Sequence, residues 1–288
     1  MSQIKLIVSD LDGTLLNSRG EVSKANLAAI RAAEAAGVLV TIATGRRFRD
    51  ARPIGLQTRL NAPIITHNGA LTKFADSLEV VNVAVLPTEA ARRVLAIGEN
   101  FGVDAMLSAD SHGKGTLYYD NLSPDNVPLQ KYVAWSRRIH GDEANDAIRH
   151  VRSLAEILPE TEPIHISFSG TCAHMQELNR VLETELAGEV RTLATVYSAQ
   201  NFTLLDILHP AASKGYGVKD FTDRHGFGPE NVMAIGDNFN DLDMLEMAGT
   251  AVVMGNADPQ MLENPRFYQT LSNDESGVAA AIEKFILN

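Results

Sequence analysis

Apolar and polar positions alternate in a regular rhythm near the start of the chain. Short apolar runs at 4–9, 38–43 and 64–66 are separated by stretches in which apolar residues recur every three or four positions. The short runs predict buried strands, and the longer spacing predicts amphipathic helices. The first helix should begin after Ser23, which can cap its N-terminus, and end at Gly37. Strands that alternate with helices predict a parallel sheet with helices on both faces.

Residues 208–288 resume the same rhythm. The apolar runs at 232–235 and 251–254 predict two more strands, and the stretch 278–286 predicts a closing helix. The two ends of the chain together therefore predict one α/β core built on a Rossmann-like parallel sheet.

The middle of the chain has a different pattern. Residues 71–85 carry alternating stretches with polar breaks and predict a hairpin arm. A mixed α+β arrangement should follow, with a first helix capped by Thr88, further helices at 148–158 and 175–186, and strands at 164–169, 190–197 and 202–208. Such a sheet with its own helices predicts a second domain at 86–207, inserted into a core of 1–85 and 208–288.

Composition limits the class of partner. The 288 residues include 36 acidic and 25 basic side chains, for a net charge of -11. An acidic chain repels nucleic acid and anionic lipid, so neither is an expected partner, and a phosphate site would need its own local cations. The sequence has no signal peptide pattern and no apolar run of membrane-spanning length. Cys172 is the only cysteine, which predicts a reducing, cytoplasmic location.

Polar side chains recur where the predicted strands end. Asp10, Thr44, Asn68 and Asp237 each lie at or just after the carboxyl end of a predicted strand. Ligands of open parallel sheets bind at that edge. Four strands that deliver polar groups to one edge therefore predict a binding site there.

The segment from Asp10 to Thr14 can carry chemistry. Asp10 and Asp12 are two residues apart, so in an extended segment both side chains would lie on one face. A cation such as Mg²⁺ would keep one carboxylate ionised as a nucleophile, while the other could exchange a proton. Gly13 permits a sharp turn, and Thr14 offers donors to an anion. The alternative is an Asp-rich turn that only closes a strand.

A second acidic cluster runs from Asp237 to Asp241. These two residues are four positions apart, so they share a side once a helix begins. With Asp10 at the same edge, the carboxylates could complete an octahedral oxygen site for Mg²⁺. The alternative is helix capping by Asp237 or Asn238.

Two further segments offer donors to a phosphoryl group. Thr44-Gly45-Arg46 supplies a hydroxyl, a small residue and a cation after a strand. Lys214 lies in Ser213-Lys214-Gly215, at the start of a predicted helix, and its point charge suits a transferring phosphoryl group. The alternatives are an ordinary loop and a solvated lysine.

These motifs resemble those of the haloacid dehalogenase-like superfamily, and more narrowly the Cof-type phosphatases. The resemblance covers both ends of the chain, and 86–207 matches the inserted cap of such proteins in position and in mixed α/β character. The ordered segments that carry the resemblance are Asp10-Leu11-Asp12-Gly13-Thr14-Leu15-Leu16, Thr44-Gly45-Arg46, Ser213-Lys214-Gly215, Gly236-Asp237-Asn238-Phe239-Asn240-Asp241 and Met254-Gly255-Asn256-Ala257.

The resemblance implies a role for each catalytic residue. Asp10 would attack phosphorus and become an aspartyl-phosphate. Asp12 would protonate the leaving alcohol and then activate water. Thr44 and Lys214 would hold the phosphoryl group. An acidic residue at position 12 is typical of the phosphatases of this superfamily rather than its dehalogenases.

The resemblance also implies a binding set. Mg²⁺ would be bound by the Asp10 carboxylate, the Asp12 backbone carbonyl and Asp237, with Asp241 in support. Asn240 would contact the phosphate. Further positions near the phosphate and substrate would be Gly45, Arg46 and Asn68.

These expectations favour a Mg²⁺-dependent phosphatase that acts on a small phosphorylated metabolite, a sugar phosphate first. The inserted domain would form a roof that excludes water and selects the substrate. We expect a monomer or a small homo-oligomer. The alternatives are a phosphomutase, which passes the phosphoryl group to another hydroxyl, and a non-catalytic protein that binds a phosphometabolite.

Overall fold

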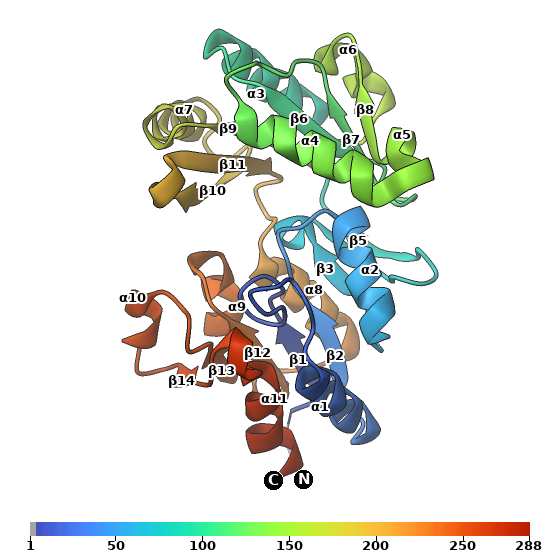
Figure 1. The fold of residues 1–288 in the computed structure, drawn as a ribbon, viewed down its shortest axis with the longest axis vertical. Coiled ribbons are helices and arrows are strands. Elements are labelled where there is room, and N and C mark those ends of the chain that lie inside the picture. Colours follow the sequence, from blue (N-terminus) through green and yellow to red (C-terminus); the bar gives the residue numbers. More distant parts are fainter. Residues whose placement is uncertain (1–3) are drawn as a thin grey trace. The chain divides into compact units, whose positions relative to one another are not determined.

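The computed structural model describes residues 4–288, which form two compact units (Figure 1). The first unit comprises Met1–Arg46, Asp50–Asn82 and Ser213–Asn288, and the second comprises Arg47–Arg49 and Val83–Ala212. The second unit contains the predicted insert, 86–207, and extends a few residues beyond it on either side. No helix within residues 4–288 has the length and apolar character needed to cross a bilayer.

A five-stranded parallel sheet organises the first unit. Every pair of neighbouring strands runs in the same direction, and β1 lies between β12 and β2. The strands, in sheet order, are β14 (Tyr268–Gln269), β13 (Thr250–Val253), β12 (Val232–Gly236), β1 (Leu6–Ser9) and β2 (Leu39–Ile42). The parallel sheet predicted from the apolar runs is therefore confirmed.

All four residues of β1 are buried, because helices cover both faces of this sheet. On one face Leu6 and Val8 pack against side chains of α8 (Lys214–His225) and α9 (Leu242–Met247). α1 (Lys24–Ala35) contacts β2 and packs against α11 (Gly277–Ile282), which continues as a π-helical turn over 283–287. The predicted α/β class is confirmed.

The ends of α1 follow the sequence signals. The Ser23 hydroxyl accepts a hydrogen bond from the backbone N–H of Asn26, as expected of an N-cap residue. Gly37 follows the helix with a φ of +85°, a left-handed conformation that glycine adopts without steric cost.

The segment 64–66 departs from the prediction. β3 (Ile64–Thr66) joins β4 (Leu71–Lys73) and β5 (Val80–Val83) in a separate three-stranded sheet, in which β3 and β4 are antiparallel. Among residues 4–288, a single isolated parallel bridge, between Ala43 and Ile65, links it to the end of β2. A tight turn over His67–Gly69 returns the chain directly, so β4 and not a crossover strand pairs with β3.

A six-stranded sheet organises the second unit. Its strands are antiparallel to their neighbours except for β7 and β8, which run parallel. In sheet order they are β10 (Arg191–Tyr197), β11 (Phe202–Leu208), β9 (His165–Gly170), β6 (Ala105–Ala109), β7 (Thr116–Tyr119) and β8 (Ile148–His150). The helices of the unit are α3 (Thr88–Asn100), α4 (Val127–His140), α5 (Ala144–Ala147), α6 (Leu154–Ile157) and α7 (Cys172–Glu185).

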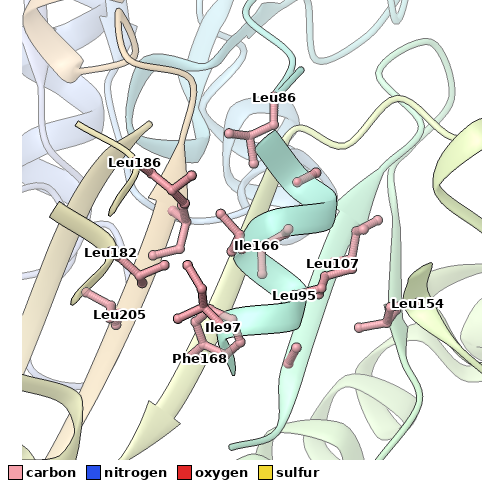
Figure 2. Packing of buried hydrophobic residues seen from close by; sticks show 14 of the residues in the cluster. Leu86, Leu95, Ile97, Leu107, Leu154, Ile166, Phe168, Leu182, Leu186 and Leu205 are labelled. Carbon is pink, nitrogen blue, oxygen red and sulfur yellow. The ribbon is translucent and has the colours of Figure 1, made fainter. Parts of the chain in front are cut away.

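Each face of the second sheet has its own hydrophobic cluster. Leu95 and Ile97 of α3 lie against Leu107, Ile166 and Phe168 of the sheet (Figure 2). On the opposite face Leu129 and Val133 of α4 pack with residues of β6, β7 and β8. The mixed α/β insert therefore has a core of its own, as domains do.

Two predictions in the insert were wrong in detail. The helix expected at 148–158 is a strand followed by one short helix, because Ile148 pairs with Leu117 in the sheet and only Leu154–Ile157 is α-helical. A short apolar run fits either element, and sheet pairing decided between them. Thr88 is the first residue of α3 rather than its cap, which is Pro87.

Candidate active site

The site is built at the carboxyl end of two adjacent parallel strands. Asp10 directly follows β1, and Asp237 directly follows β12. Ser9, the last residue of β1, is in register with Ile235 of β12, and the Asp10 N–H donates to the Ile235 carbonyl oxygen at 2.8 Å. The sheet therefore brings these two aspartates to one edge, as predicted.

A buried lysine joins the carboxylates into one cluster. The ammonium of Lys214 donates to Asp10 Oδ1 and to Asp241 Oδ1, each at 2.6 Å. Lys214 and Asp241 are fully buried, and Asp10 is 5% exposed. The solvated-lysine alternative is therefore excluded.

Three carboxylates surround this one ammonium group. Asp10, Asp237 and Asp241 each place an oxygen within 4.8 Å of the others. Burial raises the pKa of Asp10 well above its usual value, Lys214 opposes that rise, and Asp241 and Asp237 add to it. Burial likewise raises the pKa of Asp237 to about 6, against a hydrogen bond from Thr14. The cluster therefore carries excess negative charge when all three groups are ionised.

The cluster fits a hard divalent cation. Asp241 Oδ2 accepts the backbone N–H groups of Asp237 and Asn238, and Asp237 Oδ1 accepts the hydroxyl of Thr14 at 2.6 Å. Within residues 4–288, Asp10 Oδ2 and Asp237 Oδ2 accept no hydrogen bond. Two convergent carboxylate oxygens in a cluster with excess negative charge are suitable ligands for Mg²⁺, so the residues fit the predicted ion.

A sharp turn after β1 holds Asp237 in place. Gly13 has a φ of +81°, and a Cβ there would overlap the Asp237 carboxylate. The side chain of Asn256 donates to the Gly13 carbonyl oxygen at 2.9 Å. The turn therefore needs glycine both for its backbone and for the space that the aspartate occupies.

Asp12 lies apart from the other carboxylates. The chain leaves its extended conformation directly after Asp10, so the spacing argument for a shared face does not apply here. The Asp12 side chain is 57% exposed and accepts two hydrogen bonds from Arg46, Nε to Oδ2 at 2.8 Å and Nη2 to Oδ1 at 2.6 Å. The Asp12 carboxylate is thus no part of the metal-binding cluster. A contribution through its backbone carbonyl stays a prediction.

The Thr44 loop packs against the 67–69 turn. The Thr44 N–H donates to Ile65 O at 2.9 Å, and the Asn68 N–H donates to Thr44 O at 3.0 Å. A Cβ on Gly45 would lie 3.0 Å from Asn68 Oδ1, so a larger residue there would require the amide to shift slightly. The Thr44 hydroxyl accepts the N–H of Arg46 at 3.1 Å, which leaves its own proton free to donate.

The same turn also supports Lys214. A Cβ on Gly69 would overlap the carbonyl oxygen of Ser213, immediately before the lysine. The Ser213 hydroxyl accepts the N–H of Tyr216 at 3.0 Å and caps α8. The 67–69 turn, which also bonds to Thr44, therefore lies next to the start of α8, although β3 is not a strand of the five-stranded sheet.

The segment 237–241 combines capping with cluster formation. The Asn238 side chain accepts the N–H of Phe239 at 2.7 Å, so the capping alternative holds for Asn238. Asp237 instead receives the Thr14 hydroxyl and belongs to the cluster. The half-buried Asn240 makes no side-chain hydrogen bond in the described part of the chain, and its contact with phosphate stays a prediction.

Sequence reasoning missed three contacts that hold the site together. They are the hydrogen bond from Thr14 to Asp237, the bond from Asn256 to Gly13, and the pair of Arg46 with Asp12. In the sequence, Asn256 stands out only as part of Met254-Gly255-Asn256-Ala257, one of the segments that carry the family resemblance. The spacing of residues within a motif does not indicate these contacts, because each contact joins segments that are far apart in the sequence.

The raised pKa of Asp237 predicts how magnesium stabilises the protein. The pKa of the Asp237 carboxyl is about 6 in the folded protein, against 3.8 in the unfolded chain, so the folded state binds this proton more tightly. The free energy of unfolding of the metal-free protein therefore falls as pH rises from 3.8 to about 6. Below the pKa of Asp237, Mg²⁺ must displace a proton from this carboxyl before it can bind. We therefore expect Mg²⁺ to raise the melting temperature more at pH 7.5 than at pH 5, as calorimetry would measure. An equal rise at both pH values would contradict this.

Known proteins resemble the chain over nearly its whole length. Residues 7–282 match the family described as haloacid dehalogenase-like hydrolases. The chain is 32% identical to a putative phosphatase of Bacillus subtilis, YxeH, and 30% identical to the 5-amino-6-(5-phospho-D-ribitylamino)uracil phosphatase YwtE of the same organism, with 98% of both chains covered in each case. A crystal structure of a haloacid dehalogenase-like hydrolase from Bacteroides thetaiotaomicron is 27% identical, with a TM-score of 0.78 over 98% of this chain and 99% of that one.

Proposed function

Because the chain belongs to the haloacid dehalogenase-like hydrolases, we propose that it is a phosphoric monoester hydrolase acting on a small phosphorylated metabolite. The observation that carries the proposal is the buried pair of Asp10 and Lys214 within the cluster of Asp237 and Asp241. A carboxylate nucleophile beside a fixed cation is what attack on an anionic phosphate requires.

Asp10 is the proposed nucleophile. Lys214 donates to its Oδ1 and would hold the carboxylate in place while one of its oxygens attacks phosphorus. The bond between an Asp10 carboxylate oxygen and phosphorus forms as the bond from phosphorus to the leaving alcohol oxygen breaks, which yields an aspartyl-phosphate and an alcohol. Lys214 and the Thr44 hydroxyl stabilise the charge on the phosphoryl oxygens during this transfer. Bound Mg²⁺ would neutralise further phosphate charge between Asp10 and Asp237.

Asp12 is the proposed acid and base. In the first step it gives a proton to the departing alkoxide, and in the second it takes a proton from the water that attacks the aspartyl-phosphate. The second step releases inorganic phosphate and restores both aspartates. The two hydrogen bonds from Arg46 orient the Asp12 carboxylate and tie its position to the Thr44 loop.

The proposed substrate is a sugar phosphate or a related phosphorylated polyol. One relative, YwtE, is named for a substrate that carries its phosphate on a ribityl chain. In this proposal the second unit is the cap that selects the substrate. The single half-buried cysteine supports a reducing location, and the cytoplasm is the proposed compartment.

Phosphate release from a panel of phosphorylated metabolites tests the proposal. We expect turnover of some members with Mg²⁺, loss of turnover with EDTA, and recovery when Mg²⁺ is restored. Mass analysis of the product separates a phosphatase, which yields free phosphate, from a mutase, which yields an isomeric sugar phosphate. Tight binding without turnover across the panel would overturn the proposal in favour of a binding protein.

A further inference from the structure

An unprotected edge strand bounds the six-stranded sheet of the second unit. β10 is its outermost strand on one side and pairs only with β11 (Figure 1). Its seven residues pair one to one with β11, from Arg191 opposite Leu208 to Tyr197 opposite Phe202, without a bulge. Among the described residues, no other backbone group bonds to 191–196. The outer side of β10 therefore presents a row of unused N–H and C=O groups.

Three other sheet edges among the described residues are short or covered. β8, at the opposite edge of the same sheet, has three residues, of which Arg149 and His150 are exposed. In the five-stranded sheet, β14 has two residues, and the end of β2 is bridged through Ala43 to Ile65. Short length, charge and cover are the usual protections of an edge.

β10 lacks these protections. Residues 192–196 contain no charge, no proline and no glycine, and four of the five are the β-favouring or apolar types threonine, valine and leucine. Val196 is 56% exposed and Tyr197 is 46% exposed. A long, flat edge with exposed apolar side chains favours pairing with another strand.

The sequence of β10 is complementary to itself. When two copies run antiparallel with Ala194 at the centre, Thr192 lies opposite Val196 and Leu193 lies opposite Thr195, pairs that stabilise antiparallel sheets. Arg191, which has no hydrogen-bond or ion-pair partner among the described residues, lies opposite the exposed ring of Tyr197, where a cation–π contact can form. Small Ala194 lies opposite its own copy, so no side chains clash at the centre.

We propose that β10 pairs antiparallel with β10 of a second copy of this chain, which joins two six-stranded sheets into one across a two-fold axis. The symmetry of the register is the argument for a second copy rather than a foreign peptide, because a two-fold interface needs a surface that complements itself. The proposal does not depend on the proposed reaction, since no residue of the candidate active site lies in β10.

A charge at the centre of the interface tests the pairing. Ala194→Lys places two ammonium groups opposite one another and should convert a dimer into a monomer, as analytical ultracentrifugation would measure across a wide range of concentrations. Ala187→Lys makes the same change at another exposed alanine of the second unit, outside β10, and should leave the dimer intact. Both variants should release phosphate at the wild-type rate, so loss of activity would report on folding rather than on the interface.

A cross-link tests the register. In a Cys172→Ser background, Ala194→Cys should form an intermolecular disulfide, because Cα atoms of facing residues lie about 5 Å apart. Val196→Cys, also exposed, should not, because its partner across the pair is Thr192. A wild-type protein that is monomeric at every concentration, a dimer that survives Ala194→Lys, or cross-linking at 196 but not at 194 would each overturn the proposal.

Discussion

Asp10→Asn should abolish phosphate release and leave the protein folded. The amide cannot attack phosphorus, and removal of a covalent nucleophile costs on the order of 10⁴-fold or more in kcat. The fold should not suffer, because burial and the neighbouring carboxylates raise the pKa of Asp10, so its ionised form is costly in the folded state. Asparagine mimics the protonated acid, and Lys214 keeps Asp241 as a partner. We expect an apo melting temperature equal to or above that of the wild type.

Asp223→Asn on the exposed side of α8 is the matched control. It removes one carboxylate from a surface pair with Lys219, which contributes little to stability or catalysis, so activity should stay at the wild-type level. Phosphate release and calorimetry, measured on the same samples of both variants and the wild type, would show whether activity is lost while the fold is kept. Wild-type turnover by Asp10→Asn would contradict the nucleophile assignment. Lost turnover together with unfolding would instead make Asp10 a structural residue.

The parallel sheet and the main site loops were predictable because their signals are local. The central strands β1, β2, β12 and β13 are short apolar runs followed closely by Asp, Thr or Gly, and parallel strands put those ends at one edge whatever the details of packing. This is why Asp10, Thr44 and Asp237 could be assigned to one sheet edge from the sequence. The strand at 64–66 was misplaced because its pairing depends on the left-handed conformation of the next turn, which periodicity does not report.

The finer arrangement of the site could not be predicted. Spacing alone put Asp12 on the same face as Asp10, but it could not show that Arg46, 34 positions further along the chain, donates two hydrogen bonds to the Asp12 carboxylate. Similarly, nothing in Ser213-Lys214-Gly215 separates a buried lysine from a solvated one. The burial of Lys214 follows from contacts with the 67–69 turn and with Asp241. Contacts between distant segments decide these positions.

Lys214→Met should weaken both catalysis and folding. Methionine fills a similar volume without the charge, so the phosphoryl oxygens lose a donor, a change that costs about 10²–10³-fold in kcat. Asp10 and Asp241 also lose their shared cation inside the protein. Removal of one partner from a buried ion pair typically costs about 3–5 kcal/mol of unfolding free energy. Chemical denaturation and phosphate release would measure the two effects.

The loss of stability in Lys214→Met should depend on pH in a defined direction. Without the ammonium group the pKa of Asp10, already raised in the wild type, rises further. A carboxyl with a raised folded pKa contributes most stability at low pH, where it is protonated, and loses that contribution as pH rises through its folded pKa. The variant should therefore approach the wild type near pH 5 and fall furthest behind it near pH 8, with part of the difference restored by Mg²⁺. Lys219→Met, at an exposed lysine of the same helix, should match the wild type at both pH values. If the two variants behaved alike, the buried cluster would not depend on Lys214 for its charge balance, and the lysine could not have the electrostatic role proposed for it.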